Sequence, residues 1–329
     1  MGDESPVATR PRAGWKIWLR IVVSLVLLGV LVAKAPAPDE LVPDRHHVLT
    51  IALLGASLLT TFLGVVLSAW RWQRVLAVFD ERVPLRSLLG HYLAGNFVGN
   101  VLPSTIGGDV LRVTRVSTSI GSSTVGFASV VLERLTGFVA LPLLIFTGYL
   151  VRPSLFDERR AWLTILIAVV TLTVLGILLS LAGHPRIAGR FAEHENWMRF
   201  IGAVHTGVAR LRHDPGQLVP VLGTALCYQV SVVVSVAFIF RALDLPIPVA
   251  GVFVYVPAVA MLQVLPLSFN GLGVREGALV LFLAPWPGVS SAQAIAVGLL
   301  WFFATLVVSM LGAPAFAVGS RRRTPERVA

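Results

Sequence analysis

The sequence predicts an all-α polytopic membrane protein with about six full transmembrane helices and two re-entrant hairpins made of broken helices. Hydrophobic residues make up 56% of the 329 residues and charged residues only 13%, whereas soluble domains carry about 25% charged residues. Several apolar runs are long enough to cross about 30 Å of hydrocarbon as a helix. Arginines gather in the short loops between these runs, as the positive-inside rule describes. Hydropathy alone would count seven or eight transmembrane segments.

Six apolar runs are expected to cross the membrane within a single transmembrane domain over residues 15–320. They span residues 17–33, 48–70, 121–150, 161–182, 218–240 and 292–318. The first run resembles a signal peptide, because Ala33-Lys34-Ala35 matches the small-x-small pattern of a cleavage site. Since Pro36 follows directly and disfavours cleavage, we expect the run to be retained. Residues 1–14 are expected to form a disordered cytoplasmic tail and residues 321–329 a basic cytoplasmic tail.

The loop charges orient the runs in a bacterial or archaeal cytoplasmic membrane. The basic segments are the N-terminus, loop 71–86, loop 183–217 and the C-terminal tail, and all four are expected on the cytoplasmic side. Loop 71–86 is basic through Arg71, Arg74, Arg82 and Arg86. The acidic or mixed loops 34–47 and 151–160 are expected outside. This topology accounts for the net charge of +10, so a basic chain does not imply a nucleic-acid partner here.

Two further apolar segments are interrupted by glycine and proline. Residues 85–120 contain Gly95, Gly99, Pro103, Gly107 and Gly108, and residues 249–284 contain Pro257, Pro266, Gly271 and Gly273. Because proline frees a backbone carbonyl, neither segment can pass lipid-exposed as one straight helix. The loop assignments make the first segment enter and leave from the cytoplasm and the second from the outside. We therefore expect an inverted repeat, with half-repeats at residues 48–150 and 218–318.

The linker at residues 183–217 predicts an amphipathic helix. Apolar residues recur at helical spacing, from Ile187 to Leu211, with charged residues between them. Such a helix can lie on the cytoplasmic leaflet, or its apolar face can pack on the helix bundle. Both interpretations stay open.

The interrupted segments contain similar decapeptides. Residues 103–112 read Pro-Ser-Thr-Ile-Gly-Gly-Asp-Val-Leu-Arg, and residues 266–275 read Pro-Leu-Ser-Phe-Asn-Gly-Leu-Gly-Val-Arg. Each ends in an arginine, Arg112 or Arg275. Breaks at corresponding positions of two halves indicate a transporter's binding site. The residues expected to shape this pocket are Pro103, Thr105, Gly107, Gly108, Pro266, Ser268, Gly271 and Gly273.

Inserting an arginine at the centre of a transmembrane helix costs about 2.5–3.5 kcal/mol of free energy on scales derived from membrane insertion. An arginine at that depth is therefore expected to pair with an acid or to bind a ligand. The planar guanidinium group of arginine can bind a phosphate through two parallel hydrogen bonds. The backbone N–H groups at helix N-termini add further donors toward an anion. The candidate lipid-phosphate-binding residues are Arg112, Arg275, Arg134, Asp109, Glu133, Glu276 and Asn270. Candidate lining residues are Asn96, Asn100 and Gln263.

A purely structural role for these charges is the alternative. Asp109 with Arg112, and Glu133 with Arg134, could pair with one another and hold the bundle together. Adjacent residues such as Glu133 and Arg134 point in different directions on a helix, so each would then need another partner.

Several kinds of chemistry lack their sequence signatures. The single cysteine, Cys227, has no companion for a disulfide or a metal site, and the seven histidines show no metal-ligand spacing. No phosphate-binding loop for nucleotides is present, so we expect no catalytic residue, no cofactor and no metal. Trp70, Trp72, Trp162 and Trp301 are interpreted as anchors at the membrane interface.

The motif Gly107-Gly108-Asp109-Val-Leu-Arg112, the Glu133-Arg134 pair and the run from Asn270 to Glu276 resemble the flippase-like transmembrane family. That family includes the membrane half of lysylphosphatidylglycerol synthases. The resemblance covers residues 48–318 and implies a role in moving or handling membrane lipids. The positions that match the family's motifs are Pro103, Gly108, Asp109, Arg112, Glu133, Arg134, Asn270, Gly271, Gly273, Arg275 and Glu276.

The chain departs from the family pattern in two places. Leu135-Thr136-Gly137 stands where the family often has an acidic residue. The sequence ends at Ala329 without a soluble synthase domain, so we expect it not to make lysylphosphatidylglycerol by itself. A separate lipid-modifying enzyme is a possible partner that could supply the substrate. The leading hypothesis is a translocase for a phosphate-bearing lipid. The alternatives are a membrane component of polyprenyl-phosphate sugar or lipid-headgroup transfer, and a cell-envelope scaffold.

Overall fold

The computed structural model describes residues 47–101, 107–183, 197–264, 271 and 273–321, and within these residues it contains helices and no strand. The α-helices are α3 (His47–Val78), α4 (Leu85–Val101), α5 (Gly107–Ile120), α6 (Ser123–Val151), α7 (Ala161–Gly183), α9 (Trp197–His213), α10 (Leu218–Ala242), α11 (Val249–Gln263), α12 (Val274–Leu283), α13 (Ser291–Met310) and α14 (Gly312–Arg321). Short 3-10 helices are η1 (Pro153–Asp157) and η2 (Pro215–Gln217). The predicted all-α class is confirmed.

In the described part of the chain, five helices are long and apolar enough to cross a membrane: α3, α6, α7, α10 and α13. Helix α7 has the highest mean hydropathy of the five and the smallest buried share. Its side chains Leu166, Val170 and Val174 are exposed. Water would disfavour so large an apolar surface, whereas lipid solvates it. The polytopic membrane class is therefore confirmed, while the first predicted span, residues 17–33, lies outside the described residues.

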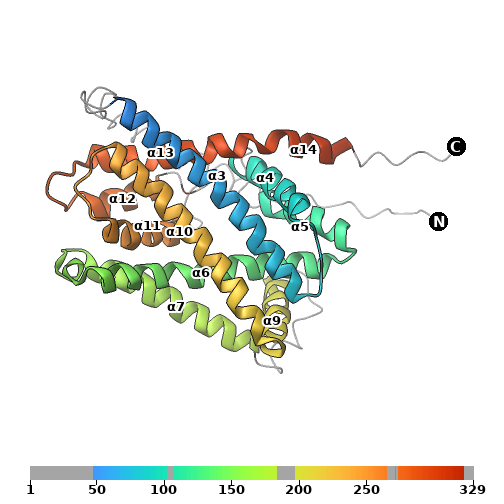
Figure 1. Ribbon diagram of the computed structural model, residues 1–329. Helices are drawn as coiled ribbons and strands as arrows, with labels where there is room; N and C mark the ends of the chain where they lie inside the picture. The colour runs from blue at the N-terminus through green and yellow to red at the C-terminus, as the bar shows by residue number, and fades with distance from the viewer. Residues whose placement is uncertain (1–46, 102–106, 184–196, 265–270, 272, 322–329) are drawn as a thin grey trace, which may run out of the picture.

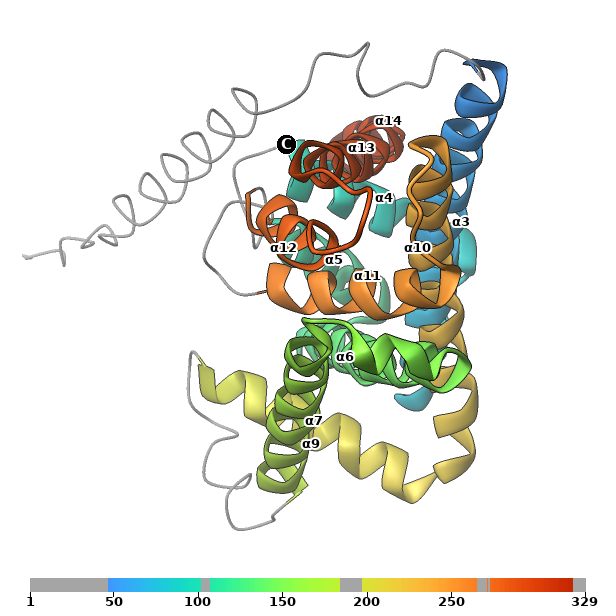
Figure 2. The ribbon, with the colours of Figure 1, turned by 90° about the vertical axis from the view of Figure 1, so that its left-hand side faces the viewer.

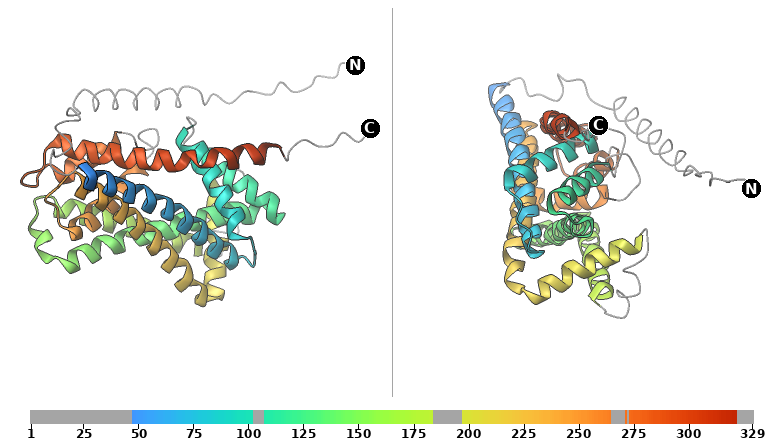
Figure 3. Two further views of the ribbon diagram at one scale, coloured as in Figure 1. Left: turned by 45° about the horizontal axis from the view of Figure 1, so that its top comes forward. Right: turned by 90° about the vertical axis from the view of Figure 1, so that its right-hand side faces the viewer.

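The helices follow the same order in both halves of the chain. Helices α3 to α6 form a sequence of one long, two short and one long helix, and α10 to α13 repeat it. In each half the two short helices contact one another, α4 with α5 and α11 with α12. The short pairs lie at opposite ends of the molecule, α4 and α5 at one end and α11 and α12 at the other (Figure 1; Figure 3, left). Their re-entry into a membrane and their inverted relation stay predictions.

Helices α3 and α10 form one side of the bundle, as Figure 2 and the right-hand view of Figure 3 show. They run antiparallel, since Ser57 meets Ser235 at 3.0 Å between hydroxyl oxygens, and Arg71, further along α3, lies over the ring of Tyr228, earlier in α10. Helix α6 runs through the middle and contacts α5, α7, α9, α10 and α11. A large apolar core includes Leu144, Ile145, Phe240, Leu279 and Phe282.

Helix α9 lies within the predicted amphipathic linker. Its buried residues Val204 and Leu211 belong to one hydrophobic cluster with Val131, Leu132 and Leu135 of α6. Its apolar face therefore packs on the bundle, as one of the two interpretations stated. The position of α9 relative to a membrane surface stays a prediction.

Three boundaries differ from the sequence interpretation. Arg71, assigned to a cytoplasmic loop, lies within α3, and only 4% of it is exposed. Pro257 lies inside α11, so it does not break the second segment. The run 292–318 is divided at Leu311 into α13 and α14. In these cases the limits of the helices differ from the limits of the apolar runs, because hydropathy alone does not fix where a helix begins or ends.

Candidate lipid-phosphate-binding cavity

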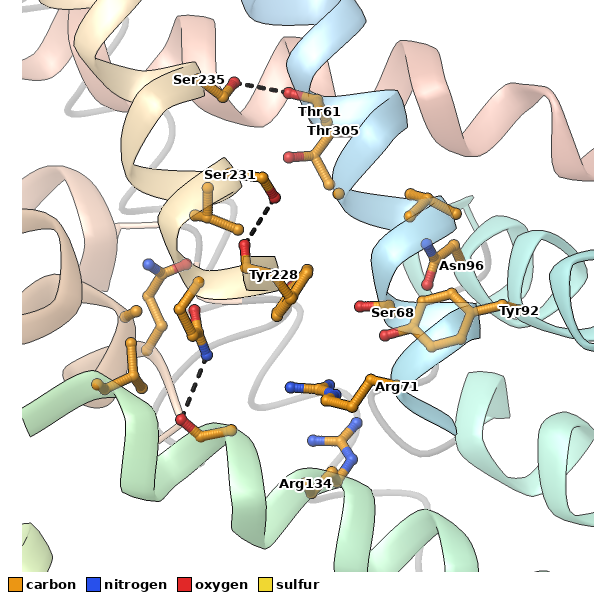
Figure 4. Close-up of a pocket in the computed structure, with 18 of the residues that line it drawn as sticks. Thr61, Ser68, Arg71, Tyr92, Asn96, Arg134, Tyr228, Ser231, Ser235 and Thr305 are labelled. Carbon is orange, nitrogen blue, oxygen red and sulfur yellow. Dashed lines mark hydrogen bonds between the residues drawn. The ribbon is translucent and has the colours of Figure 1, made fainter. Parts of the chain in front are cut away.

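A cavity of about 390 Å³ lies between the helices of the two halves. Its lining comes from α3, α4, α6, α10, α11 and α13, together with Arg112 of α5 and Arg275 of α12. Figure 4 shows part of this lining, with the guanidinium groups of Arg71 and Arg134 near one another. The two arginines of the decapeptides therefore share one chamber.

Helix α5 reaches the cavity because two glycines let it approach α4 closely. A Cβ atom at Gly108 would stand 2.5 Å from the carbonyl oxygen of Gly95, and one at Gly95 would stand 2.7 Å from Cγ of Arg112. Larger residues at either position would separate the two helices. The pair of glycines thus sets where the Arg112 side chain emerges.

Arg112 is held between two aromatic rings and a carboxylate. Its guanidinium carbon lies 4.1 Å from the centroid of Tyr92 and 4.4 Å from that of Trp72. Its Nη2 donates to Glu133 Oε2 at 2.7 Å, and its Nη1 donates to Asp109 Oδ1 at 3.4 Å. Only 4% of the residue is exposed. Stacking of this kind orients the plane of the fork, which a lysine would not reproduce.

Glu133 of α6 is shared by two arginines. Its other oxygen, Oε1, accepts from Nη2 of Arg71. Arg71 lies over the ring of Tyr228, at 4.7 Å from the centroid, and is as buried as Arg112. A buried carboxylate between two guanidinium groups keeps both cations inside the bundle, since an isolated buried charge is costly.

The ion pairs differ in part from those that the sequence suggested. Asp109 and Arg112 do pair, but Glu133 and Arg134 do not. Arg134 instead pairs with Asp109, and its side chain is half exposed. The Glu133 and Arg134 side chains diverge because they are neighbours on a helix.

Arg275 is the second residue of α12, which follows a turn with left-handed glycines. Gly271 and Gly273 have φ values of 73° and 82°, a conformation that glycine adopts at no steric cost. Glu276 Oε2 accepts from the Gly273 N–H at 2.7 Å, and Glu276 Oε1 accepts from Arg275 Nε at 3.1 Å. Glu276 is fully buried. The guanidinium group of Arg275 is therefore held by Glu276, which itself caps the N-terminus of α12.

Helix α13 covers the other side of Arg275. The guanidinium carbon lies 5.7 Å from the centroid of Trp301 and 5.2 Å from that of Phe302. Gly298 allows this approach, because a Cβ atom there would stand 2.8 Å from Cγ of Glu276. Two of the four tryptophans expected at the membrane interface, Trp72 and Trp301, are thus buried beside arginines, and that expectation is wrong for them. Trp162, at 64% exposed, remains compatible with it.

Several guanidinium donors have no hydrogen-bond partner. They are Nε and Nη1 of Arg71, Nε of Arg112 and Nη2 of Arg275, all of them buried. Among the described charged residues of the site, four arginines (Arg71, Arg112, Arg134 and Arg275) are paired with three carboxylates (Asp109, Glu133 and Glu276). The site therefore keeps an excess of positive charge. Buried donors without partners are costly and indicate a site completed by a ligand or by water.

The remaining predicted site residues are distributed as follows. Asn96, Asn100 and Gln263 line the cavity, and Asn100 donates to Ser309 Oγ at 2.5 Å. Gly107 begins α5. Pro103, Thr105, Pro266, Ser268 and Asn270 lie outside the described residues.

Sequence reasoning missed Arg71, Tyr92 and Tyr228. Arg71 follows an apolar run and was therefore counted as a loop charge. The signal that could have found it is helical spacing: Gly64, Ser68 and Arg71 recur every three or four residues and share one face of α3. All three residues line the cavity.

The fold and the cavity define a polytopic all-α membrane protein with a buried, arginine-rich chamber between two short-helix pairs. The model of the family described as lysylphosphatidylglycerol synthase TM region matches residues 17–312, and the chain belongs to this family. No curated protein and no solved structure matches the chain.

Proposed function

We propose that this protein is a lipid translocase of the cytoplasmic membrane that binds the headgroup phosphate of its lipid in the central cavity. The observation that carries the proposal is the set of buried guanidinium donors without partners on Arg71, Arg112 and Arg275, which line one chamber. An anionic phosphate supplies acceptors for such donors in charge-assisted hydrogen bonds. Membership of a family named for lysylphosphatidylglycerol synthases supports a role in lipid handling.

The arrangement suits movement of a headgroup better than chemistry on it. The carboxylates of the site are occupied by arginines, Glu133 by two of them, so they are poorly placed as general bases. We therefore assign no catalytic residue. A lipid-modifying step, where one is needed, would belong to a separate enzyme.

The two short-helix pairs provide a route for the headgroup. Arg112 and Arg275 lie in the first two turns of α5 and α12, where helix N-termini favour an anion. If the pairs are re-entrant from opposite sides, the phosphate would pass from one arginine to the other as the two halves rock. The acyl chains would stay in the bilayer.

The variant Arg275→Lys tests this proposal. Lysine keeps the positive charge but loses the Nη2 donor, so we expect translocation to slow about tenfold or more. The assay measures the quenching of acyl-labelled phosphatidylglycerol in the outer leaflet of proteoliposomes. Arg241→Lys, at the exposed C-terminal end of α10, is the matched control and should keep the native rate.

Gel-filtration profiles and thermal unfolding of both variants separate a loss of transport from a loss of folding. A folded Arg275→Lys protein with the native rate would contradict the phosphate-clamp role. A native protein that moves no phosphate-bearing lipid would contradict the translocase function itself.

A further inference from the structure

The lining of the cavity is chemically uneven along α3 and α10. Arg71 lies toward one end with Arg134, and Thr61 and Ser235 lie toward the other (Figure 4). Because the two helices are antiparallel, Thr61 pairs with Ser235, at 2.7 Å between oxygens, while Arg71 meets Tyr228. A ligand whose phosphate lies against the arginines would therefore extend its remaining headgroup along hydroxyl groups.

These hydroxyl groups present acceptors to the cavity. Thr60, Thr61, Ser231 and Thr305 each donate the hydroxyl proton to a carbonyl of their own helix, at 2.7, 2.8, 2.6 and 2.9 Å respectively. Each hydroxyl oxygen still has lone pairs, which can accept from a ligand O–H. The four side chains line the cavity.

A cationic headgroup does not find its usual partners here. Quaternary and primary ammonium groups bind over aromatic faces or against carboxylates. Four of the five aromatic rings in the described lining, those of Tyr92, Tyr228, Trp301 and Phe302, already lie against guanidinium groups, and the fifth is that of Phe138. Among the described residues that line the cavity, Glu133 is the acidic one, and its carboxylate already pairs with Arg71 and Arg112. It is therefore not available to an ammonium group.

We infer that the cavity selects a lipid headgroup that joins a phosphate to a hydroxyl-bearing group, such as glycerol, inositol or a sugar, and excludes headgroups that carry an ammonium group. The inference rests on the proposed translocase function and names its substrate class. The excess positive charge of the site and the occupied aromatic faces act against a cation, and the hydroxyl lining favours a polyol. Selectivity between headgroups depends on the difference in binding free energy, to which both the attraction of a polyol and the repulsion of a cation contribute.

The test compares acyl-labelled lipids with different headgroups in proteoliposomes of one composition. Phosphatidylglycerol and phosphatidylinositol should move at least about tenfold faster than phosphatidylcholine and lysylphosphatidylglycerol, since the loss of hydrogen bonds to the hydroxyl lining adds to the repulsion of the ammonium group by the arginines. Equal rates for all four lipids would overturn the inference and leave the translocase function standing. Movement of none of them would overturn both.

A second arm separates a lipid headgroup from free phosphate. Radiolabelled glycerol phosphate is offered to the same proteoliposomes. Its exclusion from the vesicles, together with movement of phosphatidylglycerol, is expected. Uptake of glycerol phosphate without lipid movement would show a soluble substrate and overturn the proposal.

Variants locate the selectivity. Thr61→Val with Ser231→Ala removes two acceptors at nearly constant volume, so the preference for phosphatidylinositol over phosphatidic acid, which has no polyol, should fall about tenfold. Thr147→Val is the matched control, because Thr147 makes the same bond to its own helix, to Leu143 O at 2.7 Å, and is exposed outside the cavity. An unchanged preference in the folded double variant would overturn the assignment of the hydroxyl lining.

Discussion

Glu133 shows how a single residue holds this site together. Its two oxygens accept from Arg71 and Arg112, which come from helices α3 and α5. The carboxylate is only 1% exposed, and each guanidinium side chain is 5% exposed. The packing of three helices therefore depends on one buried negative charge.

Glu133→Gln should destabilise the protein strongly. The amide keeps the size of the side chain but removes its charge, which leaves two buried guanidinium groups without a counter-charge. Loss of one partner of a buried pair costs about 3–5 kcal/mol. The measurement is the thermal unfolding of detergent-purified protein, and Asp157→Asn, at an exposed acid in η1, is the control. An unfolding midpoint equal to the native one would show that Glu133 is not needed to neutralise these arginines.

At this scale the sequence predicted which charged residues belong to the site, other than Arg71, but only part of their pairing. The pairing of Asp109 with Arg112, one helical turn apart, was one of the possibilities that the sequence left open, and the structure contains it. The partners of Glu133 could not be predicted, because Arg71 is 62 residues away in the chain. Such contacts depend on how α3 packs against α6, which local spacing does not encode.

At the scale of elements, the α4–α5 pair depends on close backbone contact. The glycines at 95 and 108 bring the two helices together beneath Arg112. Helix α5 is further tied to α14, because Arg115 donates to the carbonyls of Ala315 and Phe316, at 3.0 and 3.1 Å. Displacement of α5 would thus move an arginine of the site and the C-terminal helix together.

Gly108→Ala should push α5 away from α4, because the added Cβ would lie 2.5 Å from a backbone oxygen that has little room to move. We expect a loss of stability of about 1–3 kcal/mol, as for overpacked cores, and slower translocation. Gly90→Ala on α4 is the matched control, since its Cβ would meet no atom within 4 Å. The control should be neutral or more stable by about 0.5–1 kcal/mol, because alanine favours helix over glycine. Equal behaviour of the two variants would contradict the role of close packing.

The long helices were predicted well, because a long apolar run is enough to identify each of them. The apolar runs at 48–70, 121–150, 161–182 and 218–240 correspond to α3, α6, α7 and α10. Their ends were predicted less well: α3 continues to Val78 and carries Arg71 into the bundle. A hydropathy pattern ends where polar residues begin, whereas a helix continues while its polar residues find buried partners.

At the scale of the whole molecule, the two halves meet along α3 and α10. The hydroxyl oxygens of Ser57 and Ser235 are 3.0 Å apart, and both residues are almost fully buried. If translocation needs the halves to rock against one another, a covalent link at this contact should stop it.

Ser57→Cys with Ser235→Cys, in a Cys227→Ser background, tests this requirement. Side chains this close are compatible with disulfide geometry. We expect oxidation to reduce lipid movement to the protein-free rate and a reducing agent to restore it, as the same proteoliposome assay would record. Each single cysteine variant serves as a control. Undiminished movement in fully cross-linked protein would rule out rocking at this interface.

The sequence by itself determined the membrane class and the paired arginine motifs. Both follow from local chemistry, since apolar runs of sufficient length need lipid and interrupted runs with arginines need partners or ligands. Only the tertiary structure decided that Arg112 and Arg275 line one cavity, that Arg71 and Glu133 belong to it, and that aromatic rings cover the guanidinium groups. These contacts join helices far apart in the chain, and they arise from close packing at glycines and from the need to neutralise buried charge.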